Sequence, residues 1–148
     1  MSVDTGDSEN CIFCKIIRGE AEASFLYRGD TVSAFLDTNP LYEGHALIVP
    51  NKHFRDIHDI PEFELSEVMK VTKIISKMMT VNLKADGVNV MHSTGRPAGQ
   101  TIFHFHVHLL PRKYGDDDSF QKWWFSRTHR TTREDLDLLA VKIVGRNI

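Results

Sequence analysis

The sequence predicts a single α+β domain, and three observations indicate it. Residues 103–109 alternate apolar side chains with histidines, which is the period of a β-strand. Residues 61–87 place apolar side chains at steps of three and four, as a helix does. The chain has 148 residues and no internal repeat, so it is long enough to bury one compact core without disulfides.

Composition and charge are those of an ordinary globular protein, and we expect its ligand to be a small molecule. Hydrophobic residues make up 41% of the chain, charged residues 26%, and the formal net charge is -2, so we expect no duplex nucleic acid as partner. Residues 1–10 are polar and acidic, unlike a signal peptide, and predict a disordered lead. No apolar run approaches the roughly 18 residues of a spanning helix. We therefore expect no membrane partner and a cytoplasmic protein, with a nuclear location also open.

The first half of the chain predicts short elements. Residues 12–19 favour one helical turn. Residues 24–37 predict a hairpin of two strands around a Gly-Asp turn. A loop with proline and glycine follows, and residues 45–49 predict the next strand.

The longest predicted element is a helix that begins near Pro61 and ends before Gly87. Proline is favoured at the first helical position, and glycine suits the position just past the last turn. One face of this helix should pack on the sheet, and it carries Leu65, Val68, Met69, Thr72, Ile75, Met79 and Leu83.

The second half predicts a strand over residues 88–93, a glycine-rich loop, and the histidine strand, which Pro111 should end. Thr131 and Glu134 have the spacing of a capping box and predict a terminal helix.

Three histidines in strict alternation, His104, His106 and His108, share one face of the predicted strand. Such a face can ligate a metal, supply a nucleophile with a supporting base, or form a structural network, and the residues alone leave these uses open. The other face should be core. For His58, His92 and His129 we expect ordinary surface or core positions.

Two further motifs carry chemistry. Gly95 and Gly99, with Arg96 between them, form a candidate phosphate cradle, because backbone N–H groups there can approach an anion closely. Cys11 and Cys14 form a single C-x-x-C, which in an intracellular chain indicates metal or redox chemistry.

Residues 104–110 read His-Phe-His-Val-His-Leu-Leu, and this pattern resembles the signature of the histidine triad (HIT) family. The resemblance extends over about residues 11–112 and is strongest to the Hint-like branch of nucleoside phosphoramidases. It implies the HIT fold, an antiparallel sheet with one long central helix and a C-terminal helix, over residues 11–148. The segment from about 113 is then a C-terminal extension. The resemblance also implies a homodimer.

The resemblance implies roles for individual residues. His106 would be the nucleophile that takes the nucleoside monophosphate, His108 would contact the phosphate, His45 would join the cluster, and the Thr101 hydroxyl would lie near the leaving group. Asp37 would hold the ribose hydroxyls. The remaining nucleotide-binding positions are Phe35, Thr38 and Leu47 around the purine, and Ser93, Gly99 and Gln100 with Thr101 around the phosphate. Ser93 stands where family members commonly carry Asn, and it reaches less far.

A structural zinc ion is the implied cofactor, held by Cys11, Cys14, His53 and His104. Two thiolates and two imidazoles complete a closed tetrahedral site. In the extension, Trp123 and Trp124 can cap the site, reach a partner subunit or bury apolar surface, and we expect the last.

The expected activity is cleavage of purine nucleoside 5′-monophosphate derivatives, phosphoramidates or similar, through a covalent nucleotidyl-His106 intermediate. The alternatives are a dinucleoside polyphosphate hydrolase, a nucleotide-binding regulatory module with weak activity, and a metal-dependent hydrolase that uses the histidines as ligands.

Overall fold

The computed structural model describes residues 8–145, so most of the lead predicted to be disordered lies outside the described residues. The chain divides into two compact units, one up to Tyr114 and one from Gly115, and each is described by itself.

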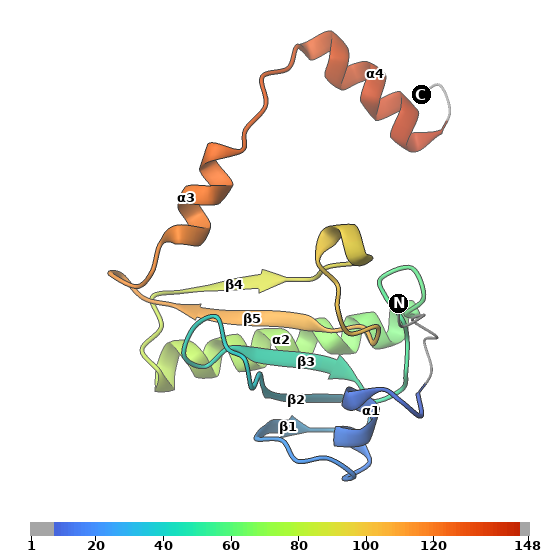
Figure 1. The fold of residues 1–148 in the computed structure, drawn as a ribbon, viewed down its shortest axis with the longest axis vertical. Coiled ribbons are helices and arrows are strands. Elements are labelled where there is room, and N and C mark those ends of the chain that lie inside the picture. Colours follow the sequence, from blue (N-terminus) through green and yellow to red (C-terminus); the bar gives the residue numbers. More distant parts are fainter. Residues whose placement is uncertain (1–7, 146–148) are drawn as a thin grey trace. The chain divides into compact units, whose positions relative to one another are not determined.

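The first unit is built on a five-stranded sheet in which every neighbouring pair is antiparallel (Figure 1). The spatial order is β1-β2-β3-β5-β4. The strands are β1 (Phe25–Arg28), β2 (Val32–Leu36), β3 (Ala46–Pro50), β4 (Gly87–Met91) and β5 (Val107–Arg112). The predicted α+β class is confirmed, and β5, which carries the last histidine of the triad, lies between two partner strands.

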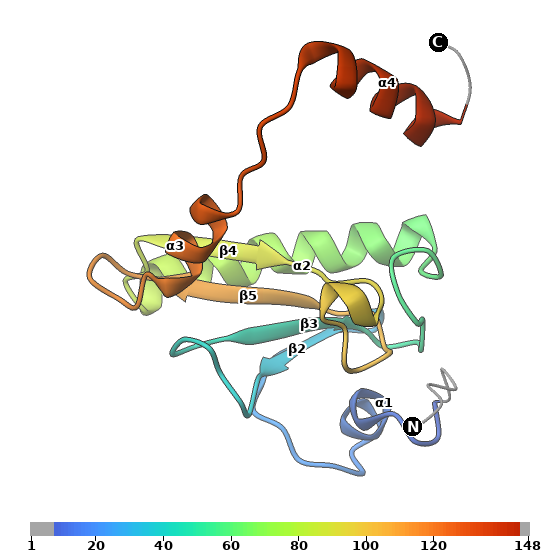
Figure 2. The ribbon, with the colours of Figure 1, turned by 45° about the horizontal axis from the view of Figure 1, so that its top comes forward.

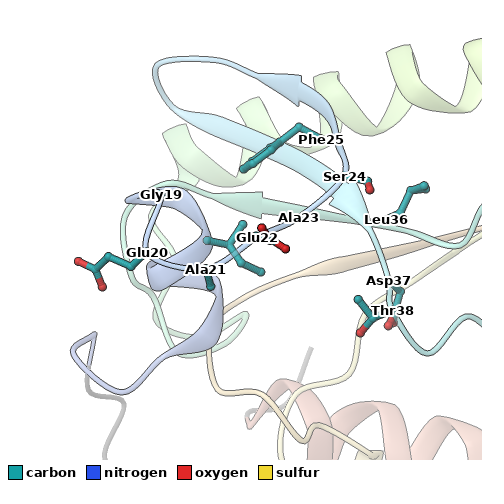
Figure 3. Close-up of a pocket in the computed structure, with 11 residues that line it drawn as sticks. Gly19, Glu20, Ala21, Glu22, Ala23, Ser24, Phe25, Leu36, Asp37 and Thr38 are labelled. Atoms are coloured by element: carbon teal, nitrogen blue, oxygen red, sulfur yellow. The ribbon is translucent and has the colours of Figure 1, made fainter.

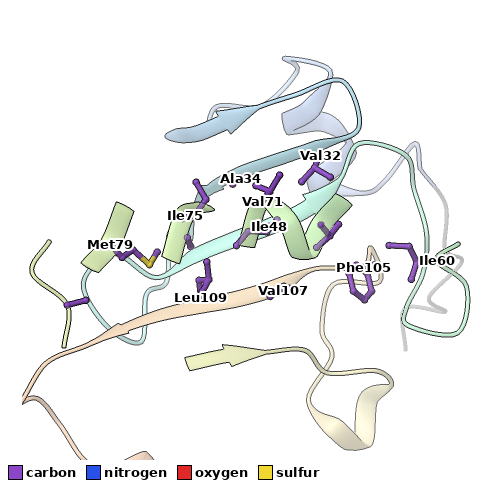
Figure 4. Close-up of a cluster of buried hydrophobic side chains, with 13 residues drawn as sticks. Val32, Ala34, Ile48, Ile60, Val71, Ile75, Met79, Phe105, Val107 and Leu109 are labelled. Atoms are coloured by element: carbon purple, nitrogen blue, oxygen red, sulfur yellow. The ribbon is translucent and has the colours of Figure 1, made fainter. Parts of the chain in front are cut away.

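Helices cover both faces of this sheet. The long helix α2 (Glu62–Asn82) packs on one face, where Val71 and Ile75 are buried against residues of β2, β3 and β5 (Figure 4). The short helix α1 (Ile12–Ile17) covers part of the opposite face (Figure 2). Its Phe13 and Ile16 belong to the buried cluster on that face. Successive strand side chains point to opposite faces, so Ala34 joins the α2 core while the next residue joins the α1 cluster.

The histidine segment keeps its predicted alternation but is a strand only in part. Phe105 and Val107 are buried in the α2 core, as predicted. Regular pairing starts only at Val107, because β3 pairs with β5 over just Val107 to Leu109. At the other end the prediction that Pro111 stops the strand is wrong, since Pro111 pairs with Val88 of β4. Pro111 lies beyond the paired part of β3, where its missing N–H leaves no ladder bond unmade.

The long helix differs from its prediction in two ways. It ends at Asn82, and Gly87 begins β4 instead of closing the helix. The chain leaves the helix through Lys84, a non-glycine residue with φ of 57°. On the predicted core face, Met69 and Leu83 are 45% and 38% exposed, whereas Val71, which was not predicted to be part of that face, is buried.

The second unit contains α3 (Ser119–Ser126) and α4 (Arg133–Val144). Within this unit Trp123 and Trp124 are 54% and 61% exposed, and α3 has no buried residue. The expectation that these tryptophans bury apolar surface stays a prediction. The predicted cap of α4 is displaced by one residue, because the Thr132 side chain accepts from the Asp135 N–H at 3.1 Å. Two adjacent threonines offer two capping frames, and the second one is used. Among the described helices, none is both long enough and apolar enough to cross a bilayer.

Candidate active site

The three histidines of the triad share one face but point to different partners. His104 Nδ1 lies 3.4 Å from both cysteine sulfurs, at Cys11 and Cys14. The other two histidines stack edge to face, with His106 and His108 ring centroids 4.8 Å apart. Among the described residues, neither group of potential metal ligands contains all three histidines. In this structure the three side chains therefore do not converge on one metal position.

The hydrogen bonds of His106 fix its protonation state. Its Nδ1 lies 2.7 Å from the backbone carbonyl oxygen of His104, which can only accept, so Nδ1 carries the proton. Burial lowers the pKa of His106, which keeps the ring neutral. A neutral imidazole has one proton, and Nε2 is consequently left with a free lone pair. This is the form that a nitrogen nucleophile needs.

A chain of bonds behind this residue fixes the proton of His108 in the same way. The Leu41 N–H donates to His45 Nδ1 at 3.1 Å, so the proton of neutral His45 is on Nε2. That Nε2–H donates to His108 Nδ1 at 2.9 Å. The proton of neutral His108 is then on its own Nε2, where it can be donated to an anion.

Both rings in this chain are neutral at neutral pH. Burial is the main cause that lowers the pKa of His108 to about 4, and the neighbouring His106 and His45 lower it further. Burial also lowers the pKa of His45. The Asp37 carboxylate, whose Oδ2 is 3.6 Å from His45 Nε2, raises this pKa by a smaller amount.

A cavity of about 410 Å³ lies in front of His106 and His108. The residues predicted to bind the nucleotide all line it: Phe35, Asp37, Thr38, Leu47, Ser93, Gly99, Gln100, Thr101, His106 and His108. His45 is not part of the lining and acts from behind His108. Beyond Asp37 and Thr38 the cavity continues into a more open groove of about 910 Å³ (Figure 3).

The glycine-rich loop is a rigid turn held by Gln100. The buried Gln100 amide donates to the carbonyl oxygens of Arg55 and Ile102, and its oxygen accepts from the Gly95 N–H. The N–H groups of residues 98–100 bond within the turn, so they are already used. Arg96 lies over the Phe103 ring, 5.2 Å from its centroid, and does not line the cavity. The loop therefore shapes the cavity wall, and Thr101 is part of that wall.

Asp37 holds its own turn as well as lining the cavity. Its Oδ1 accepts from the Asn39 N–H at 2.8 Å, an arrangement that stabilises the chain before Pro40. One carboxylate oxygen is thus used locally, and Oδ2 remains for a ligand or for His45.

The two cysteines, His53 and His104 form a cluster with the donor set of a structural zinc site. Their ligand atoms all lie within 4.8 Å of one another, and Cys14 Sγ is 3.3 Å from His53 Nδ1. Tetrahedral zinc with ordinary bond lengths places sulfur and nitrogen ligands about 3.5 Å apart, so the cluster fits the ion. His104 Nε2–H donates to the Pro50 carbonyl at 2.8 Å, which leaves Nδ1 unprotonated toward the cysteines. Both thiols are free and buried.

Comparison with known proteins decides the family, because the model of the HIT domain matches residues 18–115. The chain belongs to the histidine triad (HIT) family. An adenosine 5′-monophosphoramidase of Candida albicans is 38% identical over 108 residues, 70% of this chain and 71% of that protein. A HIT family protein of Bacillus anthracis has a solved structure with a TM-score of 0.79 and 35% identity, covering 94% of this chain and 98% of that one. The solved structure of a zinc-bound HIT protein of Mycobacterium smegmatis has a TM-score of 0.74 and 36% identity, covering 77% of this chain and 83% of that one.

Several residues of this HIT site escaped the sequence reasoning. Helix α1 supplies a wall of the cavity through Ile12, Phe13 and Ile16, and the Phe13 ring contacts the His106 ring with centroids 5.2 Å apart. The only available signal was the apolar pair between the two cysteines. His92 donates from Nδ1 to the His106 carbonyl at 2.9 Å and therefore supports the backbone of His106.

Proposed function

We propose that this HIT protein cleaves purine nucleoside 5′-monophosphate derivatives, phosphoramidates or similar, through a nucleotidyl intermediate on His106. The observation that carries the proposal is the hydrogen bond from His106 Nδ1 to the His104 carbonyl, which presents a neutral Nε2 lone pair to the cavity. The name of the C. albicans relative supports the choice of substrate.

The reaction has two displacements. His106 Nε2 attacks phosphorus, the bond from phosphorus to the leaving group breaks, and the leaving amine takes up a proton from solvent. Water then attacks the phosphorus of the intermediate and gives up a proton to solvent, the bond from phosphorus to Nε2 breaks, and the nucleoside monophosphate leaves His106 in its starting form. In both steps the His108 Nε2–H donates to a phosphoryl oxygen on which charge develops.

The predicted roles of the nucleoside end complete the proposal. A purine fits between the apolar residues of α1 and those of β2 and β3, and the ribose hydroxyls would meet Asp37 Oδ2. Thr101, on the loop, lies where its hydroxyl can assist the leaving group. Cys11, Cys14, His53 and His104 would hold zinc, and zinc there would supply no reactive water, because all four of its positions are filled by the protein.

We also propose a homodimer. Strand β4 is the last strand of the sheet, so its outer edge has no partner strand among the described residues. Val90 on β4 and Phe63, Ile74, Met78 and Val81 on α2 are exposed apolar side chains, which a second copy can cover.

His106→Ala tests the mechanism. Turnover of adenosine 5′-phosphoramidate should fall by several orders of magnitude, roughly the loss seen when a covalent nucleophile is removed, while AMP binding stays within about threefold. Activity within tenfold of the wild type would contradict the covalent route. Faster wild-type turnover of a dinucleoside triphosphate would assign the polyphosphate hydrolase instead, and AMP binding without any turnover would assign a binding module.

A further inference from the structure

The inner cavity and the outer groove are lined by different residues, and this difference distinguishes the two ends of the nucleotide site. His106, His108 and the loop residues 99–102 line the inner cavity alone, so they mark the phosphate end. The residues common to the cavity and the outer groove mark the nucleoside end: Ile16, Glu22, Ala23, Leu36, Asp37 and Thr38.

At the nucleoside end, polar side chains are few. Asp37 and Thr38 belong to the turn after β2, on the ribose side, and Asp37 Oδ1 is occupied by the Asn39 N–H. Across from this turn, the linker between α1 and β1 contributes one charged residue to the wall, Glu22. No partner for the Glu22 carboxylate occurs among the described residues, whereas the nearby Glu20 is bound to Arg18 at 2.9 Å.

The two glutamates also point in different directions. The Glu22 carboxylate lies on the side of the linker that faces Leu36 and Asp37, whereas the Glu20 carboxylate points away from them (Figure 3). A base held by the apolar walls would therefore present its polar edge, at the mouth of the cavity, to Glu22.

We infer that Glu22 selects the base and that this protein prefers guanine over adenine nucleotides. The inference rests on the proposed function, because it assumes that a nucleotide occupies the cavity. A carboxylate only accepts hydrogen bonds, and guanine offers two adjacent donors, N1–H and the 2-amino group. Adenine offers a single amino donor, and its N1 lone pair repels the second carboxylate oxygen.

The size of the preference follows from the exposed position of Glu22 at the mouth. A bidentate contact that distinguishes two bases is worth roughly fivefold in affinity at its weaker end, and the exposure of Glu22 to water places this contact there. Hypoxanthine has N1–H but no 2-amino group, so inosine monophosphate should bind with intermediate affinity.

Calorimetric titration of the full chain with GMP, IMP and AMP tests the inference without requiring turnover. The wild type should bind GMP about fivefold more tightly than AMP. Glu22→Ala should bind the two equally by losing GMP affinity. Glu22→Gln should shift the preference toward AMP, because an amide can donate to adenine N1 and accept from its amino group. Glu20→Ala is the matched control and should keep the wild-type preference.

The outcomes separate the two claims. Equal binding of GMP and AMP by the wild type, or an unchanged ratio in Glu22→Ala, overturns base selection by Glu22 and leaves the proposed function standing. Binding of none of the three nucleotides overturns both.

Discussion

Replacing Cys14 by serine should remove zinc and much of the protein's thermal stability. Cys14 Sγ lies 3.3 Å from His53 Nδ1 and 3.4 Å from His104 Nδ1, so it contacts both imidazoles. A serine hydroxyl is shorter and a far weaker zinc ligand than a thiolate. Because a metal bound only to the folded state stabilises it, the loss of affinity becomes a loss of folding free energy.

The magnitude can be worked out for ordinary conditions. If free zinc is present at about 1,000 times the dissociation constant, it contributes about 4 kcal/mol. For a chain of 148 residues each kcal/mol shifts the melting temperature by roughly 2–4 °C, so chelation should lower it by roughly 8–16 °C. The protein that remains folded should still turn over substrate, because His106 is held by the backbone of His104 and not by its side chain.

Elemental analysis and scanning calorimetry of the wild type and Cys14→Ser, each with and without a chelator, form the assay. The wild type should carry about one zinc per chain. The variant should carry none, and the chelator should move its melting temperature by less than about 1 °C, which serves as the internal control. Purified wild type without zinc, whose melting temperature added zinc does not change, would refute the four-ligand site.

Two further predictions concern the histidines behind the nucleophile. His45→Ala should lower kcat about tenfold with little change in KM, because the hydrogen bond that fixes the His108 proton is lost. His45→Gln should recover part of the lost kcat. Steady-state rates measure both effects, and a wild-type rate in His45→Ala would show that this hydrogen bond does not contribute to turnover. The lowered pKa of His108, about 4 in the fold against about 6.5 unfolded, means that the unfolded chain takes up a proton first on acidification. The free energy of unfolding should be fully maintained above about pH 6.5 and fall toward pH 4. Urea titrations should show a smaller fall in His108→Asn, and an equal fall would assign the pH dependence to other groups.

The sequence predicts an element well where residues close to it in the chain determine its structure. The helical turn at Ile12–Ile17 and the hairpin of β1 and β2 follow from nearby residues, and both are where the sequence predicts them. The end of α2 and the start of β5 depend on tertiary partners instead. No local signal shows that the chain turns at Lys84 or that β3 pairs only with Val107 to Leu109.

The candidate site shows the same division. The triad pattern led to the residues that meet in one cavity, yet it gave no sign of Phe13, which reaches His106 from far along the chain. Glycines suggested a cradle of free N–H groups, but the turn uses the N–H groups of residues 98–100 itself. Which hydrogen bonds a loop keeps for itself is decided by its folded geometry, and composition does not encode it.

His104 takes part in two separate sets of contacts. Its imidazole sits among the cysteines, and its carbonyl orients the imidazole of His106 two residues later. For protein engineering this means that a change in the Cys-His cluster also affects the position of His106, although the two sites would usually be redesigned separately. An engineer who replaces Cys11, Cys14 and His53 with apolar packing should keep His104, because its Nε2–H donates to the Pro50 carbonyl and so anchors the residue whose own carbonyl orients His106. A library that varies those three residues while holding His104, Pro50 and His92 fixed would keep the backbone around His106 supported from both sides.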